Sequence, residues 1–286
     1  MKKLLVSLLI ILVILGGGIY LSNLGADDDG LLVFAGAASK PATEEIVELF
    51  QAETGVKVNV NFGGSGTVLS QMKLNQRGDI YFPGSSDYMI KAEEEGLVKP
   101  DTIEYATYLV SAINVPKGNP KDIQSLEDLL EPGVEVGIAN PEFVCVGTYA
   151  VEVIENSLNA EEVEALRENI VYYADSCAST ANAAVLETVD AVIGWRVFED
   201  WEPEKIETIP LAKEQVLRFG YIPIAISEFS ENEELAQEFI DFIQSESGQE
   251  VFRKYGYFMS VDEAEEWLGE ERPVGGEYSV PEEWIQ

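Results

Sequence analysis

Hydrophobic residues in this chain recur at strand spacing and at helix spacing in alternation. Every second residue of the stretch 56–62 is apolar, which predicts a strand with one buried face, and residues 67–74 follow at helix spacing. The turn between them, 63–66, reads Gly-Gly-Ser-Gly. Glycine permits close approach of a ligand, and the free N–H groups of a helix's first turn point into such a loop. The turn therefore suits an anion, although a plain connector with no ligand fits it equally well.

The same strand, turn and helix pattern recurs along the chain. Residues 31–35 form a short apolar run, followed by a turn of small residues and an amphipathic helix over 43–50. Repeated units of this size predict an open, mostly parallel sheet covered by helices, with ligands outside the carboxyl ends of the strands. Further strands are expected at 78–82, 108–115, 134–138, 170–174, 191–195, 206–211 and 220–226. Further helices are expected at 88–95, 123–130 capped by Ser125, 149–158, 161–168, 181–187 capped by Ser179 or Thr180, 235–243 and 249–254.

The first residues have the composition of an export segment. Two lysines precede the apolar run 4–15, and the apolar character continues to Leu21 before an acidic stretch begins. Residues 1–26 are thus a cleaved signal peptide or an uncleaved membrane anchor, with no cysteine for lipid attachment. We expect residues from about 27 onward to lie outside the cytoplasm. The rest divides into 31–112 and 217–260 as the first lobe, 113–216 as the second lobe, and an acidic C-terminal extension, 261–286.

Composition excludes several classes of function. Asp and Glu number 52 against 18 Lys and Arg, a formal charge of −34, which argues against binding nucleic acid or an anionic membrane surface. An anionic ligand would need local amides and hydroxyls in a closed cleft. With no histidine, Ser-His-Asp and Cys-His catalysis and imidazole zinc sites are excluded. The Ser-x-x-Lys pattern of residues 70–73 lacks the partner motifs of penicillin-recognising hydrolases, so we predict no enzyme.

Six stretches, in order, resemble the molybdate-binding proteins of ABC importers, which are class II periplasmic binding proteins. The resemblance implies a two-lobed α/β fold with a tetrahedral oxyanion held by neutral donors in the cleft between the lobes. It covers nearly the whole exported chain up to about Ser260. The matching stretches are VFAGAAS at 33–39, NFGGSGTVLSQM at 61–72, GDIYFPGSSDYM at 78–89, residues 125–150, VDAVIGW at 189–195 and residues 239–257.

The resemblance implies that the first lobe supplies hydroxyl groups and backbone N–H groups to the oxyanion. Ser39 and Ser65 occupy the matching positions, and Ala38 and Gly64 precede them on the same two turns. From the second lobe, the resemblance implies donation by the backbone N–H of Val146 and by a backbone amide at Ser179.

Trp195 departs from the family pattern, because relatives usually place a tyrosine there whose hydroxyl reaches the ligand. An indole N–H donates but does not accept, so Trp195 is either a ligand donor of different reach or an ordinary core aromatic. Cys145 and Cys177 precede the two second-lobe turns and would form a disulfide or remain two buried thiols.

Two further choices concern charged residues near the cleft. A related archaeal class adds carboxylates to bind the metal through six ligands, but Glu142 after Pro141 is better interpreted as a surface residue. Arg196 and Arg218 lie near the predicted lobe crossings, where they would form hinge ion pairs or, as we favour, weak surface pairs.

Together these observations predict a monomeric solute receptor that captures molybdate or tungstate and needs no cofactor. It would deliver the anion to an ABC permease with a cytoplasmic ATPase. The alternatives are another oxyanion, such as sulfate or a phosphonate, or a surface sensor or adhesion protein that has the same fold without transport.

Overall fold

Two sheets organise the part of the chain that the computed structural model describes, residues 30–285. Contacts divide the chain into residues 1–30 and 31–286, and both sheets belong to the second unit apart from the first residue of β1. The export segment predicted for residues 1–26 lies outside the described residues. Among the described residues, no helix is both long enough and apolar enough to cross a membrane.

The first sheet has the strand order β2-β1-β3-β10-β4. Strand β3 pairs parallel with β1, while β10 pairs antiparallel with both β3 and β4. Strands β1, β3 and β4 therefore share one direction, and β10 runs against them. The bounds are β1 Gly30–Gly36, β2 Lys57–Gly63, β3 Ile80–Phe82, β4 Glu104–Leu109 and β10 Gly220–Ile226.

The second sheet repeats this arrangement in the order β7-β6-β8-β5-β9. Strand β6 is parallel to β7 and β8, and β5 is antiparallel to β8 and β9. The reversed strand in each sheet, β5 or β10, is the one with which the chain enters that lobe from the other. The predicted two-lobed α/β fold is confirmed. The bounds are β5 Ser111–Pro116, β6 Val136–Ala139, β7 Ile170–Ala174, β8 Ala191–Trp195 and β9 Ile206–Pro210.

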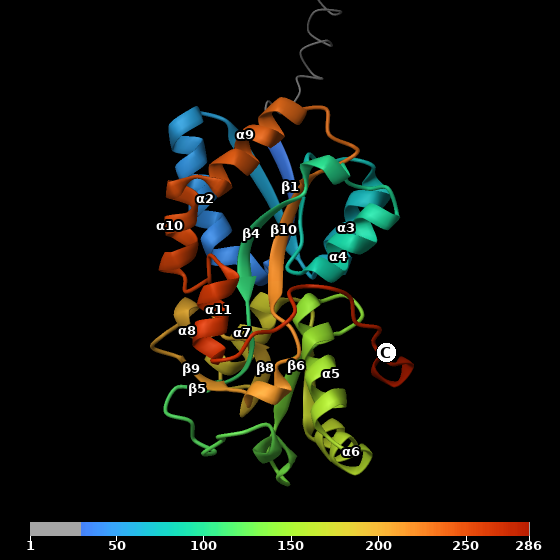
Figure 1. The fold of residues 1–286 in the computed structure, drawn as a ribbon, viewed down its shortest axis with the longest axis vertical. Coiled ribbons are helices and arrows are strands. Elements are labelled where there is room, and N and C mark those ends of the chain that lie inside the picture. The colour runs from blue at the N-terminus through green and yellow to red at the C-terminus, as the bar shows by residue number, and fades with distance from the viewer. Residues whose placement is uncertain (1–29, 286) are drawn as a thin grey trace, which may run out of the picture. The chain divides into compact units, whose positions relative to one another are not determined.

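Helices cover both sheets, as Figure 1 shows. Those of the first lobe are α2 Lys40–Thr54, α3 Ser65–Asn75, α4 Ser86–Glu94, α9 Glu233–Gln244 and α10 Glu246–Lys254. Those that follow second-lobe strands are α5 Cys145–Ser157, α6 Ala160–Asn169, α7 Cys177–Val185 and α8 Phe198–Trp201, and α11 Val261–Leu268 comes near the end of the chain. Short 3-10 helices lie at η1 Ala37–Ser39, η2 Pro100–Thr102, η3 Glu127–Leu130, η4 Lys213–Gln215 and η5 Glu282–Trp284.

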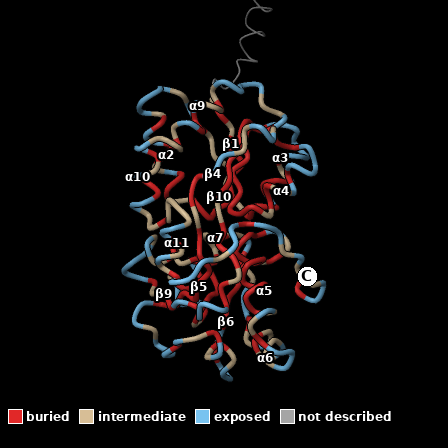
Figure 2. Tube along the Cα trace, in the orientation of Figure 1, coloured by how far each residue is buried: buried red, intermediate tan, exposed pale blue. Residues whose placement is uncertain are grey.

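The hydrophobic core is continuous across the boundary between the lobes. The core cluster of the first sheet also contains second-lobe residues such as Ala139, Val146 and Trp195, all from the carboxyl ends of strands or the helix starts beyond them. A second cluster, which includes Ile113 and Ile138, fills the rest of the second lobe. Figure 2 accordingly shows buried chain running through the level at which the two lobes meet. The lobes are therefore in direct packing contact.

Three predicted helix starts are wrong, including that of α5, which begins at Cys145, four residues before the predicted residue 149. The helix expected at 123–130 is only the 3-10 turn η3, because Asp128 accepts the N–H groups of Gln124 and Ser125 and holds them outside a helix. Helix α7 begins at Cys177, four residues before the predicted start. The cap is the hydroxyl of Ser176, which accepts the Ser179 N–H at 3.2 Å. The first turn of α7 thus contains Cys177.

Candidate functional site

The candidate site lies where helix starts of the two lobes meet. Helices α3 and α4 begin directly after first-lobe strands, and α5 and α7 begin after second-lobe strands. Two hydrogen bonds join the lobes there: Gly66 N–H donates to the Phe143 carbonyl at 2.9 Å, and the Tyr88 hydroxyl donates to the Glu142 carbonyl at 3.1 Å. Each helix start has N–H groups without intrahelical acceptors. The boundary therefore gathers donors from both lobes.

Ser65 lies at the centre of this meeting point. Its side chain is 1% exposed, and its hydroxyl oxygen accepts the Gly84 N–H at 3.0 Å. A methyl group placed on Gly84 would lie 2.6 Å from Ala38 Cβ and 2.6 Å from Cys145 Sγ. Ser65, Gly84 and Ala38 from the first lobe therefore converge on Cys145 at the start of α5.

Gly64 brings the backbones of the two lobes together. A Cβ atom at Gly64 would lie 2.8 Å from the Phe143 carbonyl oxygen and 2.9 Å from that of Asp175, both in the second lobe. Real Cβ atoms essentially never approach so closely, and a backbone carbonyl cannot rotate away as a flexible side chain can. The absence of a side chain at Gly64 is what permits this contact.

Ser39 is fully buried at the start of α2. Its hydroxyl oxygen accepts a hydrogen bond from the Thr43 hydroxyl at 2.9 Å, so its own proton remains free for another acceptor. The preceding residue, Ala38, is held by the Tyr257 hydroxyl, which donates to the Ala38 carbonyl at 2.6 Å. The predicted first-lobe residues thus lie on adjoining turns, fixed by buried hydrogen bonds.

The second-lobe wall begins with Cys145 and Val146, each 1% exposed. The N–H groups of Gly147 and Thr148 already donate to the Val144 carbonyl. The amides of Cys145 and Val146 precede them and so lie outside the hydrogen-bond ladder of α5. Val146, expected in a turn before the helix, thus lies in the first turn of α5, and its role as an oxyanion donor stays a prediction.

Ser179 is engaged within its own helix turn. Its hydroxyl donates to Asp175 at 2.6 Å, and its N–H donates to the hydroxyl of Ser176 at 3.2 Å. Ser65, Gly84, Ala38 and Cys145 form the Ser65 cluster. The α7 residue that contacts this cluster is instead Cys177, whose sulfur lies 3.5 Å from that of Cys145. Both cysteines are buried free thiols in this structure. The role of Ser179 as a donor and the disulfide both stay predictions.

Trp195 ends β8 with its side chain fully buried. Its ring packs edge-on against Tyr149 of α5, with centroids 4.8 Å apart. Three buried donors near the lobe boundary have no protein partner among the described residues: the Trp195 indole N–H, the Tyr149 hydroxyl, and the hydroxyl of Ser85, which precedes α4. Burying a donor without a partner costs about 1–3 kcal/mol, so these groups are available to a bound acceptor.

Sequence reasoning did not single out Gly84, Ser85 or Tyr149. The turn that contains Gly84 and Ser85 follows the strand predicted at 78–82. Its position at the carboxyl end of a strand could have marked it as part of a ligand site. Tyr149 had no such signal, because an aromatic residue within an amphipathic helix is usually part of the core.

The buried cation at the lobe boundary, Arg218, is neutralised, which corrects the surface pairing favoured for it. The Arg218 side chain is 7% exposed and contacts Asp87 of the first lobe at 2.9 Å and Glu152 of the second lobe at 2.7 Å. Burial alone would lower its pKa, but Tyr149, Asp87 and Glu152 outweigh that effect and raise it. Two carboxylates thus neutralise one guanidinium, and Arg218 forms a buried ion pair with each lobe. Arg196 pairs with Asp200 at 3.0 Å.

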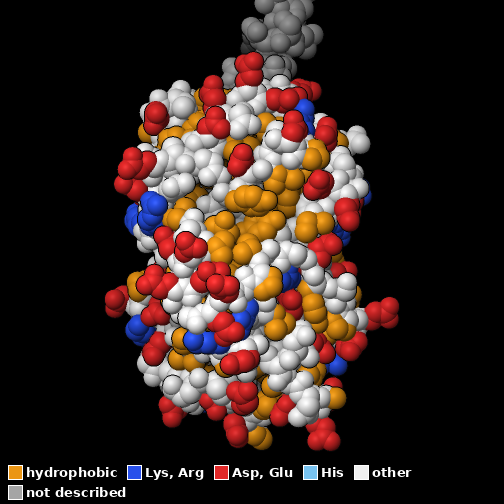
Figure 3. All heavy atoms as spheres, in the orientation of Figure 1, with side chains coloured by type: hydrophobic (Ala, Val, Ile, Leu, Met, Phe, Trp, Pro, Cys, Tyr) orange, Lys and Arg blue, Asp and Glu red, His pale blue; other side chains and the backbone are white. Residues whose placement is uncertain are grey.

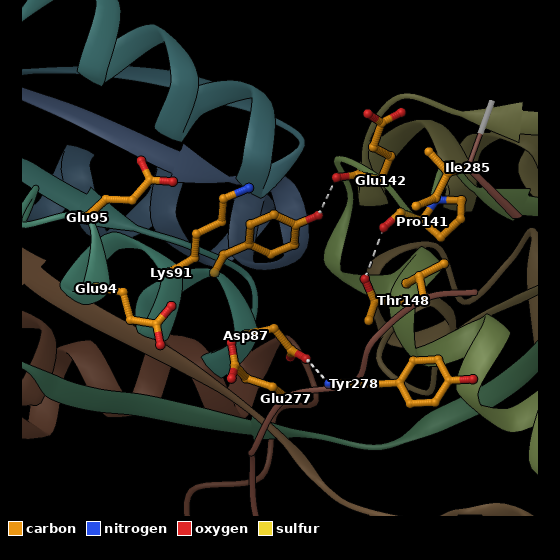
Figure 4. A pocket seen from close by; sticks show the side chains of 12 residues that line it. Asp87, Lys91, Glu94, Glu95, Pro141, Glu142, Thr148, Glu277, Tyr278 and Ile285 are labelled. Carbon is orange, nitrogen blue, oxygen red and sulfur yellow. Dashed lines mark hydrogen bonds between the residues drawn. The ribbon is translucent and has the colours of Figure 1, made fainter. Parts of the chain in front are cut away.

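A groove of about 420 Å³ opens at the lobe boundary, between α4 and the segment that leads into α5 (Figure 4). Glu142 is one of its lining residues, and none of the predicted oxyanion donors is among them. Five of its twelve lining residues are acidic and one, Lys91, is basic, and Figure 3 shows Asp and Glu spread over the visible face of both lobes. The groove therefore repels anions. It is lined by Asp87, Tyr88, Lys91, Glu94, Glu95, Pro141, Glu142, Thr148, Glu277, Tyr278, Val280 and Ile285.

Residues 31–258 match the family model described as bacterial extracellular solute-binding protein. A protein of Haemophilus influenzae named only as a binding protein is 28% identical over 79% of this chain and 90% of its own length. The molybdate-binding protein of Rhodobacter capsulatus is 26% identical over 80% of this chain and 88% of its own. The sulfate-binding protein of Synechococcus elongatus is 30% identical, but over 37% of this chain and 33% of its own.

The structure is similar to that of the periplasmic molybdate-binding protein of Azotobacter vinelandii. The TM-score is 0.70 at 17% identity, and the alignment covers 80% of this chain and 99% of the other. At this level of identity the likeness concerns the fold.

Proposed function

The chain belongs to the family of bacterial extracellular solute-binding proteins, and we propose that it captures molybdate or tungstate outside the cytoplasm and delivers it to an ABC permease. Members of this family bind solutes for transport and are not enzymes, and we propose the same for this chain. It would act as a monomer, without a cofactor, and its partner would be a permease driven by a cytoplasmic ATPase.

The observation that carries this proposal is the convergence of uncharged donors from both lobes around Ser65. The hydroxyls of Ser39 and Ser65 lie on first-lobe turns, and the amides of Cys145 and Val146 lie at the open end of α5. The nearby cation, Arg218, is already satisfied by two carboxylates. A fully deprotonated oxyanion, which only accepts hydrogen bonds, fits such a donor set.

Selectivity among oxyanions would then follow from protonation and size. An anion that keeps a hydroxyl group, such as a phosphate monoanion, presents a proton to a site built of donors, and that mismatch costs binding free energy. Sulfate and molybdate are both dianions, so charge does not separate them. The volume enclosed when the lobes meet must do so.

Binding would be coupled to closure of the lobes. Ser65 and Gly64 approach the second lobe only when the two lobes are in contact, as they are in this structure. A ligand that accepts hydrogen bonds from both sides binds the closed arrangement more tightly than an open one, and so shifts the equilibrium toward it.

Sulfate is the second candidate ligand, because the partial match to a sulfate-binding protein is 30% identical over 117 residues. It shares the charge and tetrahedral shape of molybdate but is smaller. A phosphonate, or a sensing or adhesion role without transport, are the remaining alternatives.

Isothermal titration calorimetry with molybdate, tungstate, sulfate, phosphate and thiosulfate tests the proposal. We expect molybdate and tungstate to bind with similar affinity, sulfate at least tenfold more weakly and phosphate not at all. Tighter binding of sulfate would assign the protein to that ligand instead. No heat with any of the five anions would overturn the oxyanion proposal.

A further inference from the structure

The chain continues past the family match at residue 258 with a segment that contacts both lobes. After α11 ends at Leu268, residues 269–285, the C-terminal strap, run across the lobe boundary. Figure 1 shows the strap in red, passing from α11 in front of the level where the lobes meet and on toward α5. Its contacts fall into three groups, one on the crossing segment and one on each lobe.

The first group anchors the strap to residues 211–219, where the chain returns from the second lobe to the first. The Phe219 N–H donates to the Pro273 carbonyl at 2.9 Å, and Gly275 N–H donates to the Phe219 carbonyl at 2.8 Å. The Arg272 side chain donates to the Val216 carbonyl at 2.6 Å. The strap thus pairs with the crossing segment as an added strand would.

The second group holds the strap on the first lobe. The Ser86 hydroxyl donates to the Gly276 carbonyl at 3.0 Å, and the Tyr278 N–H donates to Asp87 at 3.2 Å. Ser86 and Asp87 form the first turn of α4. Gly275 has a φ of +67°, and a Cβ there would lie 2.3 Å from the Tyr221 ring, so the turn requires glycine.

The third group fixes the end of the strap on the second lobe. Trp284 is 1% exposed and belongs to the core cluster of that lobe. Its indole N–H donates to Glu155 at 2.5 Å, and Arg167 donates to the Glu283 carbonyl at 2.8 Å. The Arg167 guanidinium also lies 5.1 Å from the centre of the Trp284 ring.

Arg218 joins the strap to both lobes at a single point. Its guanidinium donates to the Gly276 carbonyl at 2.7 Å while it pairs with Asp87 of α4 and Glu152 of α5. Separation of α4 from α5 would break at least one of these pairs and leave a buried charge with fewer partners, which is costly. The same motion would pull the strap away from α4, because Trp284 is held by the second lobe.

We propose that the C-terminal strap is a clamp that stabilises the closed arrangement of the lobes and so slows release of the bound solute. The proposal depends on opening and closing of the lobes but not on the identity of the solute. It assigns a role to a part of the chain that lies outside the matched family region.

The test measures the distance between the lobes without ligand. Spin labels replace two exposed residues, Leu74 of α3 in the first lobe and Leu186 at the end of α7 in the second. Two variants weaken the strap: Trp284→Ala removes its second-lobe anchor, and Ser86→Ala removes a first-lobe contact. Ser279→Ala, at an exposed position of the strap, is the matched control for the serine substitution.

We expect both strap variants to shift the ligand-free distance distribution toward longer distances, and Ser279→Ala to leave it unchanged. With whichever anion binds the parent protein, solute release should become about threefold to tenfold faster in Ser86→Ala. If Trp284→Ala loses its fold by circular dichroism, Ser86→Ala decides the result alone. Folded variants with the parent distance distribution would overturn the clamp, whichever solute the protein binds.

Discussion

The two walls of the candidate site differ in chemistry. The first-lobe wall carries three buried serine hydroxyls, those of Ser39, Ser65 and Ser85. The second-lobe wall carries two thiols and an indole, from Cys145, Cys177 and Trp195. Hydroxyl groups form directional hydrogen bonds, whereas thiols are weak donors that pack as small hydrophobic groups. The side-chain donors are therefore mainly on the first lobe, whereas the second lobe offers backbone amides and one indole N–H, and its thiols limit the volume enclosed.

The Cys145 thiol does not add negative charge to the second wall. Burial raises the pKa of Cys145 well above its ordinary value, and the neighbouring Cys177 raises it further. A thiol with a raised pKa stays neutral at physiological pH, so it does not repel an anion. The second wall can therefore contribute the Cys145 sulfur to the site without an electrostatic penalty.

A substitution that prevents the two walls from meeting should reduce ligand affinity the most. Gly64→Ala places a methyl group against two second-lobe carbonyl oxygens, while its φ of −63° suits alanine. We expect molybdate affinity to fall by about 3 kcal/mol, the upper end for overpacking, with little change in melting temperature. The control is Gly63→Ala, whose nearest contact is 3.0 Å away within the first lobe, at Val68. Equal affinities for the two variants in calorimetry would show that closure does not need this approach.

Removing a first-wall hydroxyl should have the next largest effect. Ser65→Ala deletes a donor at a buried site, and we expect binding to weaken by about 1–3 kcal/mol because an acceptor on the anion loses its partner. Ser70→Ala, at an exposed position of the same helix, controls for the change in α3. An unchanged affinity in the Ser65 variant would remove its hydroxyl from the site.

On the second wall, the indole N–H should matter less. Trp195→Phe keeps an aromatic ring against Tyr149 but removes the N–H, and we expect affinity to fall by about 0.5–1.5 kcal/mol, the net value of one neutral hydrogen bond. Differential scanning calorimetry measures the stability of the variant, and so separates loss of the hydrogen bond to the ligand from loss of packing in the core. A fall in stability with unchanged affinity would make Trp195 a core aromatic alone.

A disulfide between the two thiols should change ligand affinity the least. We expect an oxidising compartment to join Cys145 and Cys177, whose sulfur atoms lie 3.5 Å apart, with affinity changing by less than threefold. Mass spectrometry after alkylation in denaturant, with and without reductant, measures this on protein purified without reductant. Two alkylated thiols in the unreduced sample would rule the disulfide out.

The sequence predicted best what depends on local pattern. The strand and helix around the 63–66 turn were predictable because their apolar periodicity is strong, and their place at the carboxyl end of a strand indicated a ligand site. The start of α7 was not predictable, because Ser176 and Ser179 are both good N-cap residues. Only the extended backbone at Ser176 decides between them.

Contacts distant in sequence were not predictable. Arg218 pairs with residues that lie 131 and 66 positions away, and nothing in their local sequence marks them as neighbours. The extension predicted for 261–286 shows the same limit. Its sequence is acidic and offers Trp267 and Trp284 as possible docking points, but it does not indicate which surface they contact. Trp284 is buried in the core of the second lobe, through contacts that only the assembled lobes provide.

The neutralised guanidinium of Arg218 also has a kinetic consequence. Many anion-binding proteins attract their ligands over a distance with unpaired positive charge, and salt then slows association. Here one buried cation is matched by two carboxylates, and the chain has a formal charge of −34. The long-range field opposes an arriving dianion, and added salt weakens that opposition. Capture of a dianion should therefore become faster as ionic strength rises.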